Sequence, residues 1–219
     1  SQARLRGVWG NNNRDVFAVG LSGTILHYDG TTWSPMASGR TETLNAVWAS
    51  SATNAFAVGA TGVILHYDGN TWSPMASGTT ENLNGIWGSS ANNVFAVGGG
   101  GVILRYNGVA WAPLSSGVNL SLYGVWGTGP TNVYAVGLSG IILRYNGTAW
   151  TPMESGTYNI IYKLWGSGPN HIFAVTATGA ILVCDGATWS SMVSGTASAL
   201  YGIWGSSGGD VFAVGLGGT

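Results

Sequence analysis

The residues best suited to chemistry occupy one recurring position, immediately before a tyrosine or the residue that replaces it. That position is held in turn by His27, His66, Arg105, Arg144 and Val183. Two histidines could ligate a metal ion, but equivalent places in neighbouring repeats are expected to lie too far apart to share one. The single cysteine, Cys184, stands where other repeats have tyrosine, which favours a small buried hydrophobe over a reactive thiol. We therefore expect no metal, no cofactor and no catalytic residue.

The acidic residues also have a structural interpretation. Asp29, Asp68 and Asp185 each precede a glycine at a hairpin turn, where a carboxylate can cap the turn by accepting backbone N–H bonds. The glutamates fall in polar linking segments and are expected to be solvated: Glu42, Glu81 and Glu154. No Ser-His-Asp arrangement or phosphate-binding loop is recognisable. The sequence therefore predicts a protein that is not an enzyme.

A repeat of 39 residues must position these side chains. One unit runs from Leu44 to Asn82, and its copies follow one another without insertion or deletion. Self-similarity at such a period is typical of solenoids and propellers. Complete units span residues 5–43, 44–82, 83–121, 122–160 and 161–199, and a partial unit spans residues 200–219.

Each unit is predicted to contain four short strands. Turn-forming residues separate apolar runs that are too short for helices. In the second unit the expected strands are 44–48, 55–58, 63–67 and 71–75, with turns at 50–54, 59–62 and 68–69 and a link at 76–82. Gly59 and Gly62 are expected to supply positive φ, and Pro74 indicates that the fourth strand is an outer edge. Four antiparallel strands per repeat predict the blade of an all-β propeller.

The two tryptophans of each complete unit are expected to pack between neighbouring blades rather than to bind a ligand. Large flat side chains fill the wedge between twisted sheets, and burial of each contributes roughly 2–3 kcal/mol. The predicted core between blades consists of Trp48, Phe56, Val58, Ile64, Leu65 and their equivalents.

The partial sixth unit leaves the number of blades open. We expect residues 1–219 to form one propeller domain with about six blade positions, the last incomplete, and five blades as the alternative. The strand at 211–215 would present an outer edge that no lysine or proline guards. We therefore expect that the chain is a fragment or that a neighbouring chain completes the blade, and we expect self-association.

Composition limits the partners. Lys plus Arg number 7 and Asp plus Glu number 8, which argues against a nucleic-acid partner because that would require a basic face. Only 7% of residues are charged, so the surface must consist largely of small neutral polar groups. Such a surface is typical of a secreted or cell-surface protein, and no apolar run approaches the roughly 20 residues of a membrane span. We expect any leader peptide to lie outside this chain.

The segment VILHYDGNTW, Val63 to Trp72, resembles the Asp-box or BNR-type repeat of sialidase-like propellers, with one residue missing between Asp and Gly. Together with the preceding AVGxxG of Ala57–Gly62, the unit is similar to the propeller repeats of photosystem II assembly factors. It also resembles VWGSS…VFAVG…GTILHYDG…W arrays of bacterial secreted or surface proteins. The resemblance implies a bacterial propeller. Sialidase activity would require an arginine cluster with a Tyr–Glu pair, which this sequence lacks.

Two functions follow as hypotheses. The first is a multivalent, lectin-like binding module whose partner is a glycan or cell-surface polymer, because repeated weak sites multiply avidity. Its sites would lie in grooves between blades, lined by the turns at 11–14, 50–53, 89–92 and 128–131. The candidate ligand-binding residues are Asn11, Ser51, Ser90, Thr128 and Ser167. The alternative is a structural subunit of an extracellular assembly, joined through the incomplete blade.

Overall fold

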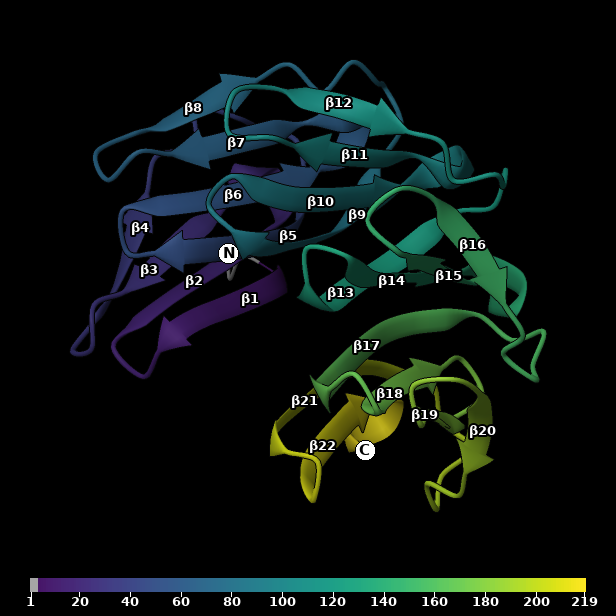
Figure 1. The fold of residues 1–219 in the computed structure, drawn as a ribbon. Helices are drawn as coiled ribbons and strands as arrows, with labels where there is room; N and C mark the ends of the chain where they lie inside the picture. The colour runs from purple at the N-terminus through teal and green to yellow at the C-terminus, as the bar shows by residue number, and fades with distance from the viewer. Residues whose placement is uncertain (1–3) are drawn as a thin grey trace. The chain divides into compact units, whose positions relative to one another are not determined.

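The computed structural model describes residues 4–219, which form β-strands joined by turns and short 3-10 segments. Figure 1 shows the strands gathered into antiparallel sheets, of which five have four strands and the sixth has two. The chain divides into two compact parts between Leu114 and Ser115. Within residues 4–219, no helix is long and apolar enough to span a membrane.

The N-terminal part contains sheets 1 to 3, in each of which the strands lie side by side in chain order. Sheet 1 comprises β1 (Leu5–Asn12), β2 (Asp15–Gly20), β3 (Ile25–Tyr28) and β4 (Trp33–Met36). Sheet 2 comprises β5 (Leu44–Ser51), β6 (Asn54–Gly59), β7 (Ile64–Tyr67) and β8 (Trp72–Met75). Sheet 3 comprises β9 (Leu83–Ser90), β10 (Asn93–Gly98), β11 (Ile103–Tyr106) and β12 (Trp111–Leu114). Short 3-10 segments join the second and third strands: η1 (Leu21–Gly23), η2 (Ala60–Gly62) and η3 (Gly99–Gly101).

The C-terminal part contains sheets 4 and 5 and a two-stranded sheet, here called the open hairpin. Sheet 4 comprises β13 (Leu122–Gly129), β14 (Asn132–Gly137), β15 (Ile142–Tyr145) and β16 (Trp150–Met153), with η4 at Leu138–Gly140. Sheet 5 comprises β17 (Ile161–Gly168), β18 (His171–Thr176), β19 (Ile181–Cys184) and β20 (Trp189–Met192). The open hairpin comprises β21 (Leu200–Ser207) and β22 (Asp210–Gly215), followed by η5 (Leu216–Gly218).

The first two strands of each unit extend further than the sequence predicts. β5 continues to Ser51 and β6 begins at Asn54, so the turn is Ala52–Thr53 rather than residues 50–54. The Asn54 side-chain amide donates to the Ser50 hydroxyl at 2.8 Å and ties the two strands together at this end. Small polar residues that are typical of loops therefore support the end of the ladder here.

The turn after the second strand corrects the role expected of Gly59. Its φ is −164°, which is extended backbone, whereas the positive φ values of this turn belong to Thr61 at 52° and Gly62 at 74°. Gly59 is needed for space instead, because a Cβ there would lie 2.1 Å from the carbonyl oxygen of Thr43. The expectation for Gly62 is confirmed.

The hairpin turn between the third and fourth strands has the predicted cap. Asp68 Oδ1 accepts hydrogen bonds from the backbone N–H groups of Asn70 and Thr71, both at 2.8 Å. The Thr71 bond, followed by the Asn70 bond, lowers the pKa of the Asp68 carboxyl. Gly69 has a φ of 98° and completes the turn. Asn107 accepts the equivalent pair of bonds in the third unit, so an amide oxygen serves as well as a carboxylate.

The edge strand is also as predicted. β8 lies at the outer end of sheet 2, and Pro74 pairs there with Leu65 of β7. In a central strand every backbone N–H takes part in the hydrogen-bond ladder on one side or the other, and proline has no N–H to donate. Because β8 has a neighbouring strand on one side only, proline is tolerated there.

The sheets of each compact part stack through two unlike faces. The front face of sheet 2 carries the cross-strand row Trp48, Phe56 and His66, and the back face carries Ala55, Tyr67 and Trp72. The front face of sheet 1 packs on the back face of sheet 2, where the Trp9 indole N–H donates to the Ala49 carbonyl at 3.0 Å. The apolar core between these sheets includes Phe17, Val19, Ile25, Val47, Ala57, Leu65, Tyr67 and Trp72.

The predicted core is confirmed in the middle of the chain and wrong at its last unit. Trp48, Phe56, Val58, Ile64 and Leu65 are all buried. Their counterparts on the open hairpin are exposed: Trp204, Phe212 and Val214. The difference arises because, in the described chain, the front face of the open hairpin is not covered by a following sheet.

Candidate binding site at the open hairpin

The side chain at the recurring His/Arg position forms a polar contact within each of sheets 1 to 4. His27 Nε2 lies 2.7 Å from Asp15 Oδ1, and His66 Nε2 lies 2.6 Å from Asn54 Oδ1. The imidazole rings also stack on a phenylalanine of the same sheet, with His66 and Phe56 centroids 4.5 Å apart. Among the described residues, no group of three or more His, Cys, Asp or Glu could hold a metal ion. These side chains therefore brace the second and third strands.

Arginine makes the same contact in the next two units. Arg105 Nε donates to Asn93 Oδ1 at 2.7 Å, and Arg144 Nε donates to Asn132 Oδ1 at 2.9 Å. The Arg105 guanidinium also lies over the Phe95 ring, 5.6 Å from its centroid. The fifth unit has Val183 at this position and Cys184, which is buried, in place of tyrosine. The expected burial of the thiol is confirmed.

The residues predicted to bind a ligand lie at strand ends rather than in open loops. Each stands in the first strand of its unit, beside the two-residue turn: Asn11, Ser51, Ser90, Thr128 and Ser167. Asn11 donates to Asp15, and the Thr128 hydroxyl accepts a 2.8 Å bond from the Asn132 amide. The Ser51 hydroxyl lies 3.3 Å from that of Thr53. The hydrogen bonds of these three residues, Asn11, Ser51 and Thr128, serve their own hairpins.

A different feature stands out at the open hairpin. β21 and β22 pair with each other from Leu200↔Gly215 to Ser207↔Asp210, and within the described chain β22 has no strand on its other edge. In sheet 2 the equivalent strand, β6, pairs on both sides, with β5 and with β7. The β22 edge therefore presents backbone groups that other units use in a sheet.

Apolar side chains beside this edge are also uncovered within the described chain. In the N-terminal part, Phe56 of sheet 2 meets Tyr106 and Trp111 of sheet 3, with ring centroids 5.1 and 5.8 Å apart. In the C-terminal part, Tyr134 of sheet 4 meets Trp189 of sheet 5 edge-on at 6.3 Å. Phe173 of sheet 5 is the next residue in this series, and the open hairpin in front of it supplies neither aromatic partner within the described residues.

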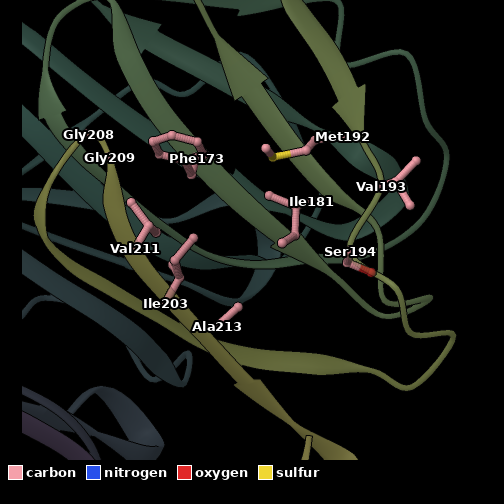
Figure 2. A pocket seen from close by; sticks show the side chains of 10 residues that line it. All are labelled: Phe173, Ile181, Met192, Val193, Ser194, Ile203, Gly208, Gly209, Val211 and Ala213. Carbon is pink, nitrogen blue, oxygen red and sulfur yellow. The ribbon is translucent and has the colours of Figure 1, made fainter.

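A cavity of about 330 Å³ occupies that place. Figure 2 shows it between sheet 5 and the open hairpin, and its ten lining residues are Phe173, Ile181, Met192, Val193, Ser194, Ile203, Gly208, Gly209, Val211 and Ala213. From sheet 5, Phe173, Ile181 and Met192 correspond to Phe17, Ile25 and Met36 of the core between sheets 1 and 2. From the open hairpin, Ile203, Val211 and Ala213 correspond to Val47, Ala55 and Ala57 of the same core. The cavity thus has the lining of the core between sheets 1 and 2, but the described chain supplies no counterparts of Leu65, Tyr67 and Trp72 to fill it.

The cavity is apolar and uncharged. Its lining contains no ionisable side chain, and Ser194 directs its hydroxyl to the Thr196 carbonyl at 3.2 Å. The charge on β22 is at its start, where the Asp210 carboxylate accepts a hydrogen bond from the Ser206 hydroxyl. Such a site favours apolar and aromatic groups and offers no ionic contact to a charged ligand.

A second surface feature is a row of tyrosines on the first strands of the C-terminal part. Tyr123 of β13 and Tyr162 of β17 have ring centroids 5.8 Å apart, and Tyr162 and Tyr201 of β21 have centroids 4.9 Å apart. Burial, followed by the two neighbouring phenols, raises the pKa of Tyr162. Tyr201 at the end of the row is 47% exposed.

Sequence reasoning found the unpaired strand but missed the cavity and the tyrosine row. The signal for the cavity was the absence of the counterparts of Leu65, Tyr67 and Trp72 from the partial unit. The signal for the row was tyrosine at one repeat position in three consecutive units, where earlier units have Arg6, Asn45 and Asn84.

The repeated four-stranded antiparallel sheets, stacked front to back within each part, define a β-propeller repeat protein. The chain is similar to a structure of YCF48 bound to D1 peptide, with a TM-score of 0.77, 20% identity, and coverage of 100% of this chain and 76% of that one. It is also similar to YCF48 from Cyanidioschyzon merolae (TM-score 0.63, 15% identity, 97% and 93% coverage). The WD40 β-propeller domain of Doa1 gives a TM-score of 0.82 at 14% identity, with 97% and 76% coverage. No family model and no curated protein matches the sequence.

Proposed function

We propose that the chain is a non-catalytic, protein-binding propeller whose open hairpin accepts an extended polypeptide segment. The observation that carries the proposal is the cavity of about 330 Å³ beside an unpaired strand edge. An extended peptide can add to such an edge through main-chain hydrogen bonds while alternate side chains enter the cavity. The site therefore offers both affinity and side-chain selection.

The backbone of β22 is oriented for this addition. In sheet 2 the Gly59 N–H points toward the third strand and donates to Val63, and Gly215 makes the equivalent bond to Thr219 at 2.9 Å. Backbone N–H groups of alternate residues point to the same side of a strand. Ala213 and Val211 therefore direct their N–H and C=O groups to the open edge.

The fold and the surface support the same function. The structure of YCF48 bound to D1 peptide shows that a chain with this fold can hold a peptide. A chain in which only 7% of residues are charged suits an apolar or neutral partner and fits an extracellular setting. The place of binding at the open hairpin is proposed from the cavity and the unpaired edge of β22.

A labelled single strand tests the proposal. A fluorescein-tagged peptide of residues 63–67, VILHY, is titrated into the 219-residue chain and followed by fluorescence polarisation and by hydrogen exchange. We expect saturable binding and slower exchange of the Val211 and Ala213 amides. The variant Ala213→Pro removes one edge donor without removing a bond to β21, so it should weaken binding.

Equal affinity of the parent chain and Ala213→Pro, or unchanged exchange along β22, would count against strand addition. Phe212→Pro serves as the matched comparison, because its N–H points toward β21 and its loss should destabilise the hairpin itself. The pair separates an effect on the edge from an effect on folding.

Glycan binding is a second candidate, and the tyrosine row is the observation that favours it. Exposed aromatic faces and hydroxyl groups suit neutral sugars, and Tyr201 leaves nearly half of its surface open. A glycan array probed with the chain and with Tyr201→Ala tests this function. Signals that are lost in the variant would support it, and an array without signal would remove it.

Self-association is a further possibility for the same edge. A second copy can pair its own β22 with the first, which would satisfy the backbone groups of both and give a closed dimer. Mass measurement across micromolar concentrations tests this pairing. A dimer that Ala213→Pro dissociates would support it, whereas a monomer at every concentration would exclude it.

A further inference from the structure

We infer that the hairpin turns at Asn107–Gly108 and Asn146–Gly147 are sites of spontaneous modification, at which the folded chain converts the asparagine amide into a carboxylate. Both turns join the third and fourth strands of a complete sheet, β11 to β12 in sheet 3 and β15 to β16 in sheet 4. The reaction consumes water and requires no enzyme or cofactor. The inference is independent of the open hairpin and of the function proposed for it.

The chemistry is that of an asparagine followed directly by glycine. The glycine backbone nitrogen attacks the asparagine Cγ, a new C–N bond closes a succinimide ring, and ammonia leaves with the glycine amide proton. Water then opens the ring. Addition of water at Cγ gives aspartate, whereas addition at the main-chain carbonyl carbon gives isoaspartate. Glycine favours ring closure because it has no Cβ to obstruct the attacking nitrogen.

The side chain of Asn107 is already folded over the backbone that follows it. Its Oδ1 accepts hydrogen bonds from the N–H groups of Val109 and Ala110 at 2.9 and 3.0 Å. This oxygen gains negative charge when Cγ is attacked, and hydrogen-bond donors that are already in place stabilise such a charge. The turn therefore assists the first step of the reaction.

The Asn146 turn has the same arrangement. Asn146 Oδ1 accepts hydrogen bonds from the N–H groups of Thr148 and Ala149, both at 2.9 Å. Among the described residues, the Gly147 N–H donates no hydrogen bond, and neither does that of Gly108, so the attacking nitrogen is free in both turns. Both asparagines are exposed, which gives water access to the ring.

A third Asn-Gly pair in the chain provides an internal control. Asn84 and Gly85 lie within β9, where Gly85 is buried and pairs with Val97 of β10. Ring closure rotates the backbone between the asparagine and the glycine, and the hydrogen-bonded ladder of a sheet opposes that rotation. We therefore expect Asn84 to keep its amide while the chain is folded.

Other units of the chain show that the aspartate product fits the turn. The position of Asn107 is held by aspartate in the first, second and fifth units: Asp29, Asp68 and Asp185. Asp68 accepts the same pair of backbone bonds, and those from Thr71 and Asn70 lower the pKa of its carboxyl. Conversion therefore preserves the cap and adds an ionised carboxylate. Two conversions would change the formal net charge from −1 to −3.

The isoaspartate product does not fit in the same way. It routes the main chain through Cβ and Cγ of the former asparagine and so lengthens the connection between two paired residues. In sheet 3 these are Tyr106 at the end of β11 and Trp111 at the start of β12. We expect the isoaspartate form to unfold at a lower temperature than the parent, and the aspartate form to keep a Tm near that of the parent.

Timed incubation of the folded 219-residue chain at mildly alkaline pH tests the inference, because base removes the glycine amide proton and speeds ring closure. Anion exchange separates the species by charge, and proteolysis with mass spectrometry assigns each conversion to its asparagine. We expect Asn107 and Asn146 to convert at least about tenfold faster than Asn84, whose strand must first open. Unfolding the chain in guanidinium should bring the three rates together.

Protein variants identify the products. Asn107→Asp and Asn146→Asp each place the expected product in one turn. Each variant should co-elute with a singly converted species of the parent, keep a Tm near that of the parent, and show one charge step fewer on incubation. Asn84→Asp is the matched control, and it should correspond to no species that accumulates in the folded parent.

The outcomes are distinct. Conversion at the two turns while Asn84 keeps its amide supports the inference. If Asn107 and Asn146 keep their amides in the folded chain and lose them only after unfolding, the turns protect the amide and the inference is wrong. Equal conversion at all three asparagines of the folded chain would also overturn it, because the geometry of the turn would then have no effect.

Discussion

Trp87 and Trp204 occupy the same position in the 39-residue unit, yet Trp87 is 7% exposed and Trp204 is 62% exposed. Both lie in the first strand of their sheet and pair with a phenylalanine of the second, Phe95 or Phe212. Local sequence is therefore almost identical. The two indoles therefore differ in burial and not in the hairpin that carries them.

Replacing Trp87 with alanine should therefore lower the free energy of unfolding by about 3–5 kcal/mol, as large core truncations do. The same change at Trp204 should cost less than about 1 kcal/mol, since exposed side chains contribute little. Urea denaturation of the two variants beside the parent chain measures both values. Similar losses of unfolding free energy in the two variants would show that this tryptophan stabilises its own hairpin and that its burial adds little.

Gly59→Ala tests whether the glycine before η2 is required for space. The new Cβ would lie 2.1 Å from the Thr43 carbonyl oxygen, and a backbone atom cannot rotate away. We expect a loss of about 1–3 kcal/mol, toward the upper end, because overpacking must shift main chain. Gly129→Ala is the control, since its Cβ would meet no atom within 4 Å. A neutral Gly59→Ala variant would contradict the close approach.

His66 should make stability depend on pH in the mildly acidic range. Burial lowers the pKa of His66 from its ordinary value of 6.5, and the nearby Asp68 carboxylate opposes this effect. The unfolded chain therefore binds the proton more readily, and stability falls as pH drops below 6.5. Between pH 8 and pH 5 the parent should lose more stability than His66→Gln. Parallel pH profiles would show that the imidazole titrates normally in the folded protein.

The cap at Asp68 can be separated into charge and hydrogen bonding. Asp68→Asn keeps an acceptor for the N–H groups of Asn70 and Thr71, as Asn107 does in the third unit. We expect Asp68→Asn to keep a Tm near that of the parent and Asp68→Ala to lower it. The carboxyl pKa is lowered by these bonds, so the stability it contributes should fade as pH drops below 3.8. A Tm for Asp68→Ala equal to that of Asp68→Asn would argue against the cap.

Several features followed from the sequence because their causes are local. The repeat predicted four strands per unit, the Asp68–Gly69 turn depends on adjacent residues, and Pro74 by its chemistry indicated an edge strand. Turn length was misjudged because Ser50 and Asn54 hydrogen-bond across the strands and extend the ladder. Gly59 was misjudged because its neighbour is the Thr43 carbonyl, which only folding brings close.

The sequence by itself determined the unit, since periodic apolar residues, turn chemistry and two tryptophans recur every 39 residues. Only the tertiary structure decided which copies of a residue are buried, because a front face becomes core when a back face covers it. Phe17 and Phe173 occupy the same repeat position, but Tyr67 and Trp72 contact Phe17, whereas a cavity adjoins Phe173. The row from Tyr123 to Tyr201 likewise required the stacking of three first strands, a relationship between units that no single unit encodes.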